Sequence, residues 1–401
     1  MIPKEWDIQP LSEIATVTSG GTPSRTKPEY WQNGTVPWIR TTEVQNCVLN
    51  PEDVKEYISE QGLKNSSAKL VPAGTILLAM IGQGKTRGQV ALLKFEASTN
   101  QNAATIVFNK DQEPEFHFNF LLSQYENIRG MSNSAGQSNL SGALVKAIKV
   151  PVPPLPEQKK IAQILSTWDK AITTTEQLLA NSQQQKKALM QQLLTGKKCL
   201  LDKNGVRFSG GWKWSKIQEV GMVVTGSTPP KSDENNYGGD VLWATAEDFA
   251  GKYVSDTKIK LSDKGSTKAR IVPKGSVLVT CIASIGKNAI ANEDMGTNQQ
   301  INAVVVSDSF SNEFFYYQIE FNVNKLISIA GVTAVPIVNK SSFQQVKLIF
   351  PVLEEQQKIA AVLSTADQEI SALQQKLDAF KQEKKALMQQ LLTGKRRVKL
   401  N

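Results

Sequence analysis

The residues that could bind phosphate or carry out catalysis do not form a familiar active site. Residues 79–86, AMIGQGKT, match a relaxed phosphate-binding loop with Ala79 in place of the first glycine. Such a loop would hold phosphates with backbone N–H groups and with Lys85. A strand-like run, VALLKF, follows Thr86 where that loop requires a helix, so the pattern favours a β-hairpin tip. A P-loop NTPase stays open as an alternative.

The other candidates for chemistry are isolated. The single histidine, His117, excludes Ser-His-Asp and multi-histidine metal sites, and its setting EFHFNF predicts a packed helix residue. Cys47, Cys199 and Cys281 are scattered and odd in number, which indicates a reducing cytosol and neither a disulfide framework nor a metal cluster. No glycine-rich loop of the S-adenosylmethionine type is found. The chain is therefore predicted to be non-catalytic, with no cofactor or metal of its own.

One stretch occurs twice and organises the rest of the chain. Residues 155–196 and 353–394 align without a gap and are identical at 25 of 42 positions. Both copies are rich in Gln, Lys, Ala, Leu and Glu, and neither residues 158–195 nor residues 354–393 contain glycine or proline. Each copy ends at a glycine followed by lysine, which is typical of a helix C-terminus. We expect two helices, each roughly 60 Å long at about 1.5 Å per residue.

Large apolar residues recur in these helices at alternating steps of four and three, the 3.5-residue period of a coiled-coil seam. Lys186 and Lys384 interrupt the two seams at the same place. They could fix the register of a helix pair, or their stems could lie along the surface of their own domain. The apolar seam residues are Ile161, Leu165, Trp168, Ile172, Leu179, Leu189 and Leu193 in the first helix, and Ile359, Leu363, Ile370, Leu373, Leu377, Phe380, Leu387 and Leu391 in the second.

A globular segment precedes each helix, and the second segment repeats the first in outline. We expect domains at 1–150 and 212–350, helices at 151–198 and 351–397, and a linker at 199–211. The repeated motifs are GGTPS (20–24) and GSTPP (226–230), VPWIR (36–40) and VLWAT (241–245), LVPAGTILL (70–78) and IVPKGSVLV (271–279), and STNQNA (98–103) and GTNQQINA (296–303). We interpret these shared motifs as scaffold, and the divergent loops between them as the parts that differ in target.

The net charge of +9 is concentrated in the helical segments and their tails. Residues 1–150 carry 14 basic and 14 acidic side chains, and residues 211–350 carry 14 and 13. Residues 151–210 carry nine basic and four acidic side chains, and residues 351–401 carry nine and six. Charge alone therefore supports a nucleic-acid partner only weakly, and a solvated basic helix face explains it equally well. No apolar run is long enough to cross a membrane, and we expect a cytoplasmic protein.

With these motifs in place, the chain resembles the DNA-specificity subunit of type I restriction–modification systems over nearly its whole length. The most specific part is the boundary motif PVPPLPEQKKIAQILSTWD with its second copy FPVLEEQQKIAAVLSTAD. The doubled helix end KKALMQQLLTGK and the TNQ segments also resemble the family. The second boundary motif lacks the extra prolines of the first, which leaves the fine geometry of that junction open.

The resemblance implies an α+β fold: two mixed α/β target recognition domains separated by two long antiparallel coiled-coil helices, with a pseudo-two-fold internal repeat. Each domain would recognise one half of a bipartite site in double-stranded DNA, and the helices would set the spacer. Two modification subunits would dock on the helices and supply adenine methylation with S-adenosylmethionine. Motor-nuclease restriction subunits would add cleavage that depends on ATP and Mg²⁺.

The residues that contact DNA can only be predicted from loop position and chemistry, and a solvated surface charge is the alternative for each. A second class of function, a coiled-coil scaffold that joins proteins without recognising DNA, also stays open. The candidate DNA-binding residues are Arg25, Lys27, Arg40, Lys85, Arg87, Lys231 and Lys287.

Overall fold

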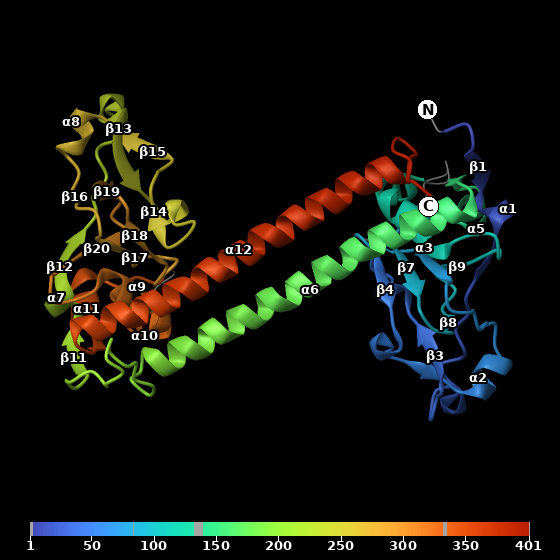
Figure 1. Ribbon diagram of the computed structural model, residues 1–401, viewed down its shortest axis with the longest axis horizontal. Coiled ribbons are helices and arrows are strands. Elements are labelled where there is room, and N and C mark those ends of the chain that lie inside the picture. Colours follow the sequence, from blue (N-terminus) through green and yellow to red (C-terminus); the bar gives the residue numbers. More distant parts are fainter. Residues whose placement is uncertain (1–2, 83, 132–138, 332–334, 401) are drawn as a thin grey trace. The chain divides into compact units, whose positions relative to one another are not determined.

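The chain forms two compact units that each contain half of both long helices (Figure 1). The structure is a computed structural model that describes residues 3–82, 84–131, 139–331 and 335–400. Unit 1 comprises the chain up to Glu176 and from Gln375 onward, and unit 2 comprises Gln177–Gln374. Helix α6 (Leu155–Leu193) passes from unit 1 into unit 2, and α12 (Leu353–Leu391) passes from unit 2 into unit 1. The observed helices lie inside the predicted spans 151–198 and 351–397.

Unit 1 is built on a five-stranded sheet whose central strands are buried on both faces. All neighbouring strands are antiparallel except β4 and β7, which are parallel. One face packs under α3, α4 and α5, and the other forms a second apolar cluster. The near-continuous apolar runs of β6 and β7 follow from burial on both sides. The strand order is β2 (Ala15–Ser19), β9 (Ala103–Phe108), β6 (Ile76–Ala79), β7 (Val90–Leu93), β4 (Cys47–Leu49), and the helices are α3 (Pro114–Ser123), α4 (Tyr125–Gly130) and α5 (Gly142–Lys146).

Smaller sheets complete unit 1. A three-stranded sheet carries the VPWIR motif on its central strand, and a two-stranded sheet joins the start of the chain to the segment before α6. The three-stranded order is β5 (Tyr57–Ile58), β3 (Val36–Ile39), β8 (Ser98–Thr99), and the two-stranded sheet pairs β1 (Asp7–Pro10) with β10 (Lys149–Val152). Short helices are α1 (Leu11–Ile14) and α2 (Glu60–Lys64), with 3₁₀ turns η1 (Pro28–Tyr30), η2 (Thr41–Glu43) and η3 (Pro51–Asp53).

Unit 2 repeats the main sheet strand for strand, including the parallel pair at its edge. Its second sheet has one more strand than that of unit 1, β16, where unit 1 has only the isolated bridge between Val71 and Ala97. The main sheet has the order β12 (Gly221–Thr225), β20 (Ile301–Val306), β17 (Val277–Thr280), β18 (Asn288–Ala291), β14 (Tyr253–Val254). The second sheet has the order β15 (Ile259–Leu261), β13 (Tyr237–Ala244), β19 (Met295–Thr297), β16 (Ile271–Val272), and β11 (Lys213–Lys216) pairs with β21 (Lys347–Phe350). The helices are α7 (Ile217–Val220), α8 (Asp263–Ser266), α9 (Asn312–Phe321), α10 (Val323–Ser328) and α11 (Lys340–Gln345), with 3₁₀ turns η4 (Glu234–Asn236) and η5 (Ala246–Asp248). The predicted α+β fold with an internal repeat is confirmed.

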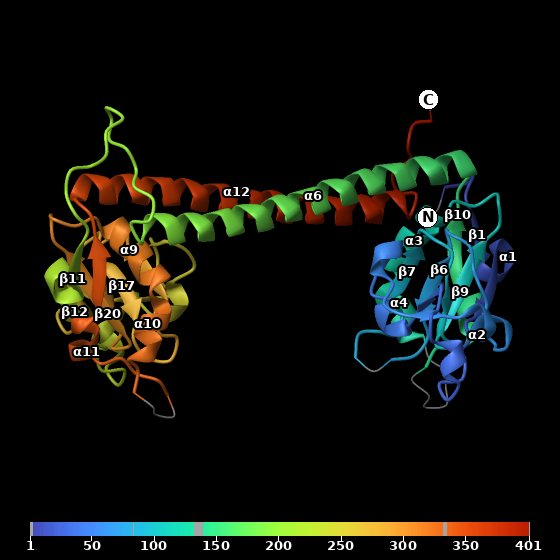
Figure 2. The same ribbon diagram turned by 90° about the horizontal axis from the view of Figure 1, so that it is seen from below.

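In each unit, one helix of the globular part lies between the main sheet and the long helices. Phe116 of α3 shares an apolar cluster with Ile161 and Leu165 of α6, and α3 lies beside β7 (Figure 2). In unit 2, Phe314 of α9 shares a cluster with Ile359 of α12. The ends of the predicted seams therefore pack against the globular part of each unit as well as against the partner helix. No helix among the described residues is long and apolar enough to span a membrane.

The two long helices run antiparallel within each unit. In unit 1, Asp169 of α6 pairs with Lys384 of α12, and seven residues further along α6 Glu176 lies 2.8 Å from Lys381. In unit 2, Ser182 hydrogen-bonds Glu369 at 3.2 Å, and Lys186 lies 2.7 Å from Asp367. Residue numbers rise along one helix as they fall along the other, which defines the antiparallel direction.

The structure places every predicted seam residue at a buried or partly buried position. Eight are buried, near the ends or the middle of the helices, and one aromatic pair lies between the helices. Trp168 and Phe380 meet edge to face, with ring centroids 5.6 Å apart, and both rings remain partly exposed. The fully or nearly buried members are Ile161, Leu165, Leu179, Leu193, Ile359, Leu363, Leu377 and Leu391, and the partly buried ones are Trp168, Ile172, Leu189, Ile370, Leu373, Phe380 and Leu387.

Replacing the aromatic pair tests its part in holding the helices. Because both rings are partly exposed, we expect Trp168→Ala and Phe380→Ala each to cost about 1–2 kcal/mol, less than a fully buried ring. Their direct contact should add a coupling of about 0.5–1.5 kcal/mol, so the loss of melting temperature in the double variant should be smaller than the sum of the single losses. Leu178→Ala, at a leucine that is 50% exposed, is the control and should leave the melting temperature nearly unchanged. Strictly additive losses would contradict a direct packing contact.

Candidate nucleic-acid interface

The repeated motifs of each unit meet at one place. Gly20 approaches the TNQ segment so closely that a Cβ there would lie 2.0 Å from the carbonyl oxygen of Thr99. A Cβ at Gly226 would lie 2.1 Å from the carbonyl oxygen of Asn298. The next backbone N–H donates to the TNQ threonine carbonyl at 2.8 Å in both units, from Gly21 and from Ser227. A residue with a side chain does not fit at Gly20 or Gly226 without moving the backbone, so the glycines are required by this close approach.

Side chains close the same junction in both units. The indole N–H of Trp38 donates to the carbonyl of Gly21 at 3.0 Å. The indole N–H of Trp243 donates to the carbonyl of Ser227, also at 3.0 Å. We name this arrangement of glycine loop, tryptophan and TNQ segment the motif junction. It explains why these motifs recur: they are one hydrogen-bonded scaffold, built twice.

Beside the motif junction of unit 1, the structure brings two predicted DNA-binding arginines together around one carboxylate. The guanidinium of Arg25 lies 3.4 Å from the centre of the Trp31 ring and forms two hydrogen bonds with Glu56. Arg40 lies 3.9 Å from the same Glu56 and 3.2 Å from Glu43. Both arginines are about half exposed, so each presents part of its guanidinium to solvent while carboxylates hold the rest.

Lys27 is also held by a neighbour. Its ammonium group lies 3.1 Å from the hydroxyl of Tyr30. This hydrogen bond raises the pKa of Lys27, so the side chain is charged at neutral pH. Lys27 therefore remains available as a cation on the exposed loop that precedes η1.

Residues 80–89 connect β6 to β7 as a hairpin, whereas a P-loop would lead into a helix. Within this connection Gln83 lies outside the described residues. Lys85 is exposed, and its backbone carbonyl accepts a hydrogen bond from the hydroxyl of Tyr125 at 2.6 Å. Arg87 turns toward its own unit and donates to the carbonyl of Arg129 at 3.1 Å. Of the two, only Lys85 has the exposure that a contact to DNA requires.

Lys287 is not the structural counterpart of Lys85, although each lysine follows a glycine in its hairpin. Leu78 pairs with Val90 in unit 1, and Val279 pairs with Asn288 in unit 2. Since Leu78 corresponds to Val279, Lys287 corresponds to Gln89. The cause is a difference in loop length: unit 2 has a shorter hairpin, so the shared Gly-Lys letters lie at different structural positions.

In unit 2 the predicted cations are more widely spread. Lys231 is exposed and corresponds to Arg25. Lys287 is exposed and donates to the carbonyl of Ala246 at 2.7 Å, beside η5. The position of Arg40 is occupied by Thr245, whose hydroxyl bonds Asp248 at 2.8 Å. The two units therefore share a backbone arrangement but present different side chains around it.

Two cations that the sequence motifs did not single out lie next to the motif junctions. Arg270 donates from its backbone N–H to the hydroxyl of Ser227 at 2.9 Å and from its guanidinium to the carbonyl of Thr225 at 2.8 Å. Lys69 holds the corresponding place in unit 1, directly before the LVPAG motif, and is exposed. A search for basic residues bordering the repeated motifs would have found both.

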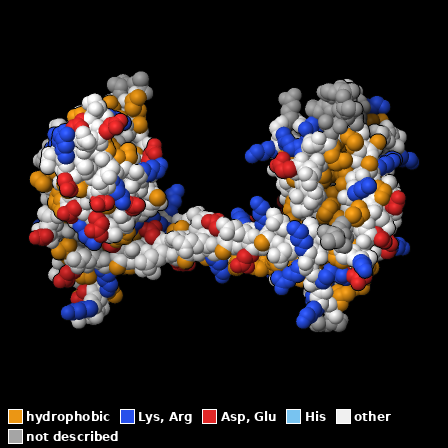
Figure 3. All heavy atoms as spheres, turned by 90° about the horizontal axis from the view of Figure 1, so that it is seen from above, with side chains coloured by type: hydrophobic (Ala, Val, Ile, Leu, Met, Phe, Trp, Pro, Cys, Tyr) orange, Lys and Arg blue, Asp and Glu red, His pale blue; other side chains and the backbone are white. Residues whose placement is uncertain are grey.

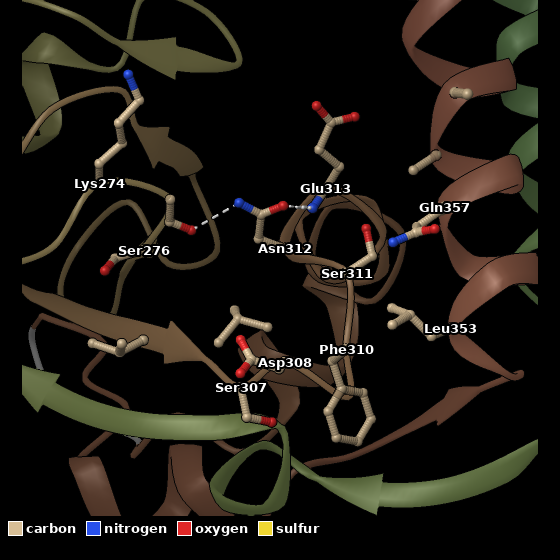
Figure 4. A pocket seen from close by; sticks show the side chains of 15 residues that line it. Lys274, Ser276, Ser307, Asp308, Phe310, Ser311, Asn312, Glu313, Leu353 and Gln357 are labelled. Carbon is tan, nitrogen blue, oxygen red and sulfur yellow. Dashed lines mark hydrogen bonds between the residues drawn. The ribbon is translucent and has the colours of Figure 1, made fainter.

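Unit 2 also has a mixed surface charge and a cavity lined by none of the motif-junction residues. Basic and acidic side chains are interspersed on the face of unit 2 in Figure 3, as its nearly balanced charge requires. A cavity of about 500 Å³ in unit 2 is lined by Lys274, Asp308, Glu313 and Gln357 (Figure 4). It contains no cysteine or histidine, and no group of metal-binding side chains is found among the described residues.

His117 is a packed residue of α3, as its sequence setting predicts. Its ring is fully buried, stacks on Phe108 with centroids 4.5 Å apart, and bonds Gln112 through Nε2 at 3.0 Å. Burial lowers the pKa of His117 to about 3, so the ring is neutral in the folded chain at neutral pH. Its role is therefore in packing, and proton transfer to a substrate would need an exposed ring.

Comparison with known proteins decides the family. A family model described as type I restriction modification DNA specificity domain matches residues 3–181 and 209–382. The chain belongs to this family. Each matched stretch covers one globular part and most of the long helix that follows it, so the specificity domain is present twice.

Specificity subunits of other type I systems are similar to all or to part of the chain. The type I restriction enzyme MjaIX specificity subunit of Methanocaldococcus jannaschii is 23% identical over 420 residues, which is 99% of this chain and 95% of that protein. The type I restriction enzyme EcoR124I/EcoR124II specificity subunit of Escherichia coli is 29% identical over 170 residues, 41% of each chain.

Solved structures of the family share the fold. The type I restriction–modification system S subunit from M. genitalium superposes with a TM-score of 0.62 at 14% identity, covering 100% of this chain and 97% of that one. The HsdS subunit from Thermoanaerobacter tengcongensis superposes with a TM-score of 0.51 at 20% identity, covering 98% of each chain. The specificity-domain family thus keeps this architecture at low sequence identity.

The buried histidine of this specificity-domain protein predicts a pH effect on stability. An unfolded histidine binds a proton below about pH 6.5, whereas folded His117 binds one only near pH 3. The unfolded state therefore binds more protons between these values, and stability falls as the pH is lowered, by about 1.4 kcal/mol per pH unit from this group. The variant His117→Phe keeps a ring for stacking. Its free energy of unfolding, measured by chemical denaturation, should fall less steeply between pH 6 and 4 than that of the wild type. Equal slopes for variant and wild type, after matching at pH 8, would contradict this assignment.

Proposed function

We propose that this chain is the sequence-specific DNA recognition subunit of a type I restriction–modification complex. Each globular part would recognise one half of a bipartite site in double-stranded DNA. The observation that carries the proposal is the motif junction, built twice from the same residues and surrounded by different exposed side chains. The membership of the chain in the specificity-domain family supports the same conclusion.

The division between shared scaffold and variable surface is what a recogniser of two different half-sites needs. Arg25 with Glu56 borders one junction, while Lys231 borders the other. Arg40 in unit 1 corresponds to Thr245 in unit 2. Arginine can form two hydrogen bonds with guanine, whereas a threonine or a lysine makes different contacts with base edges. Different side chains on one scaffold would therefore select different bases.

The long helices would serve the complex in two ways. As an antiparallel pair, they would set the distance between the two recognition parts. Their exposed faces would dock two methyltransferase subunits. Those subunits would bind S-adenosylmethionine and methylate adenine, and motor-nuclease subunits would bind ATP and Mg²⁺ for cleavage. The chain itself would recognise DNA and carry out neither reaction.

Independent recognition by the two units can be tested by replacing residues 1–150 with the first domain of another specificity subunit. Because the second recognition surface is left intact, we expect methylation mapping of host DNA to show a change in one half-site only. The unmodified gene, expressed with the same methyltransferase subunits, is the control. Altered bases in both half-sites would contradict independent recognition, and an absence of methylation with the unmodified gene would favour the scaffold alternative.

The helices can be tested as a ruler by inserting one heptad after Gln177 and one after Gln375. Seven residues keep the seam in phase, because they are two seam steps. The recognition parts should move apart by roughly 10 Å at about 1.5 Å per residue, equivalent to about three base pairs of B-DNA. Three pairs also turn the distant half-site by over a quarter turn, at about 10 pairs per turn, so activity should fall.

Methylation mapping of the insertion variant gives the decisive measurement. We expect both half-site sequences to stay as they are and only the spacer between them to lengthen, because no recognition loop is altered. A variant with four residues inserted at the same points breaks the seam phase and serves as the control for helix pairing. A seven-residue variant that methylates efficiently with the original spacer would show that the helices do not set the distance.

A further inference from the structure

Two exposed glutamines keep the same hydrogen bond in both units. The hydroxyl of Thr22 donates to Oε1 of Gln101 at 2.5 Å, and the hydroxyl of Thr228 donates to Oε1 of Gln299. Each pair connects the glycine loop to the last residue of the TNQ segment. Both glutamines are exposed, so packing in a core does not explain why they recur.

The shared hydrogen bond fixes which end of each amide faces solvent. Since Oε1 accepts from the threonine, the NH₂ group of Gln101 or Gln299 is left as an outward donor. Neither NH₂ group has a protein acceptor among the described residues. An amide held in one orientation loses little side-chain entropy when an acceptor arrives, which favours binding at this position.

A cation borders the strand that leads into the TNQ segment in both units. Ile271 pairs with Gly296, and Val272 pairs with Met295, in the antiparallel β16–β19 ladder. One step further along this register, Arg270 is opposite Thr297, the first residue of the TNQ segment. In unit 1, Val71 bridges Ala97 in the same register, which sets Lys69 opposite Thr99. Each motif junction therefore carries an amide donor in the turn that follows one strand and a cation in the segment alongside that strand.

The donor set identifies the chemistry of the ligand. It consists of an amide N–H₂ and a positive charge, and the charge is lysine in one unit and arginine in the other. A phosphate oxygen accepts from both types of group, and exchange of lysine for arginine is tolerated when only the charge is needed. A base edge would distinguish the two side chains. The two half-sites of a bipartite DNA site differ in bases but share the sugar–phosphate backbone.

We propose that Gln101 with Lys69, and Gln299 with Arg270, form one DNA phosphate contact in each unit, oriented by Thr22 and Thr228. These contacts would position each unit on the duplex without recognising sequence, while the divergent loops contact the bases. The inference rests on the proposed function and assigns it a backbone-binding site.

The test measures binding of the full chain, assembled with its methyltransferase subunits, to labelled duplexes. One duplex carries the mapped site and another an unrelated sequence. Loss of one neutral hydrogen bond should weaken binding about three- to tenfold, so Gln101→Ala and Gln299→Ala should weaken both duplexes by the same factor. Gln101→Glu should weaken both more than Gln101→Ala does, because its charge repels a phosphate, and the extra loss should shrink at high salt.

Replacing the cations should change the salt dependence of DNA binding. Lys69→Gln and Arg270→Gln should each lower the slope of log affinity against log salt by about one, and equally for both duplexes. Gln61→Ala, at an exposed glutamine of α2, is the matched control and should bind as the wild type does. All variants should keep the melting temperature of the wild type, which separates a lost contact from a damaged fold.

Three results would overturn the inference. Wild-type affinity in both alanine variants would show that the amides do not touch DNA. A loss confined to the mapped duplex would assign the glutamines to base recognition, and a loss that follows the melting temperature would assign them to the scaffold. If the wild-type complex binds neither duplex, the proposed function itself fails, and that outcome is distinct from wild-type binding with unaffected variants.

Discussion

Two ion pairs between the long helices fix the register on which each unit depends. Lys384 of α12 pairs with Asp169 of α6, and Lys186 of α6 pairs with Asp367 of α12. Both lysines are only 14% exposed, so each needs a counter-charge. A one-step slip of either helix would leave a lysine and an aspartate without their partners, which costs more than the loss of one apolar contact. The seam lysines therefore specify register.

The pair in unit 2 also ties the helices to the globular part. Lys186 lies 3.1 Å from Glu320 of α9, and the hydroxyl of Tyr317 donates to Asp367 at 2.5 Å. Burial alone would lower the pKa of Lys186, but the hydrogen bond with Asp367 and the charge of Glu320 raise it overall. In unit 1 the corresponding residues of α3 are Asn119, whose amide donates to the carbonyl of Glu115 at 2.8 Å, and the apolar Leu122, so the network is not extended there. The repeat thus keeps the cross-helix pair and varies what surrounds it.

The sequence predicted the parts of the structure that follow from periodicity and repetition. Heptad spacing predicted the long helices to within a few residues, because an apolar period of 3.5 residues buries its apolar side chains only when the segment is a helix. The repeated glycine-loop, tryptophan and TNQ motifs predicted a shared scaffold. They did not predict that the three motifs contact one another. Loop residues were less predictable, since their environment comes from distant segments. Arg25 depends on Glu56, and Arg87 is turned inward by the carbonyl of Arg129.

Pre-paired cations have a consequence for how such a surface would recognise DNA. Arg25 is stacked on Trp31 and held by Glu56, so its guanidinium is oriented before any ligand arrives. Orientation lowers the entropy lost on binding, but the carboxylate must be displaced or bypassed by an acceptor of better geometry. A randomly placed phosphate gains little from that exchange, whereas a base edge that accepts two parallel hydrogen bonds gains more. Nearly neutral globular parts with paired arginines therefore give up non-specific affinity in favour of selectivity, and partner subunits can supply the rest of the charge that holds the duplex.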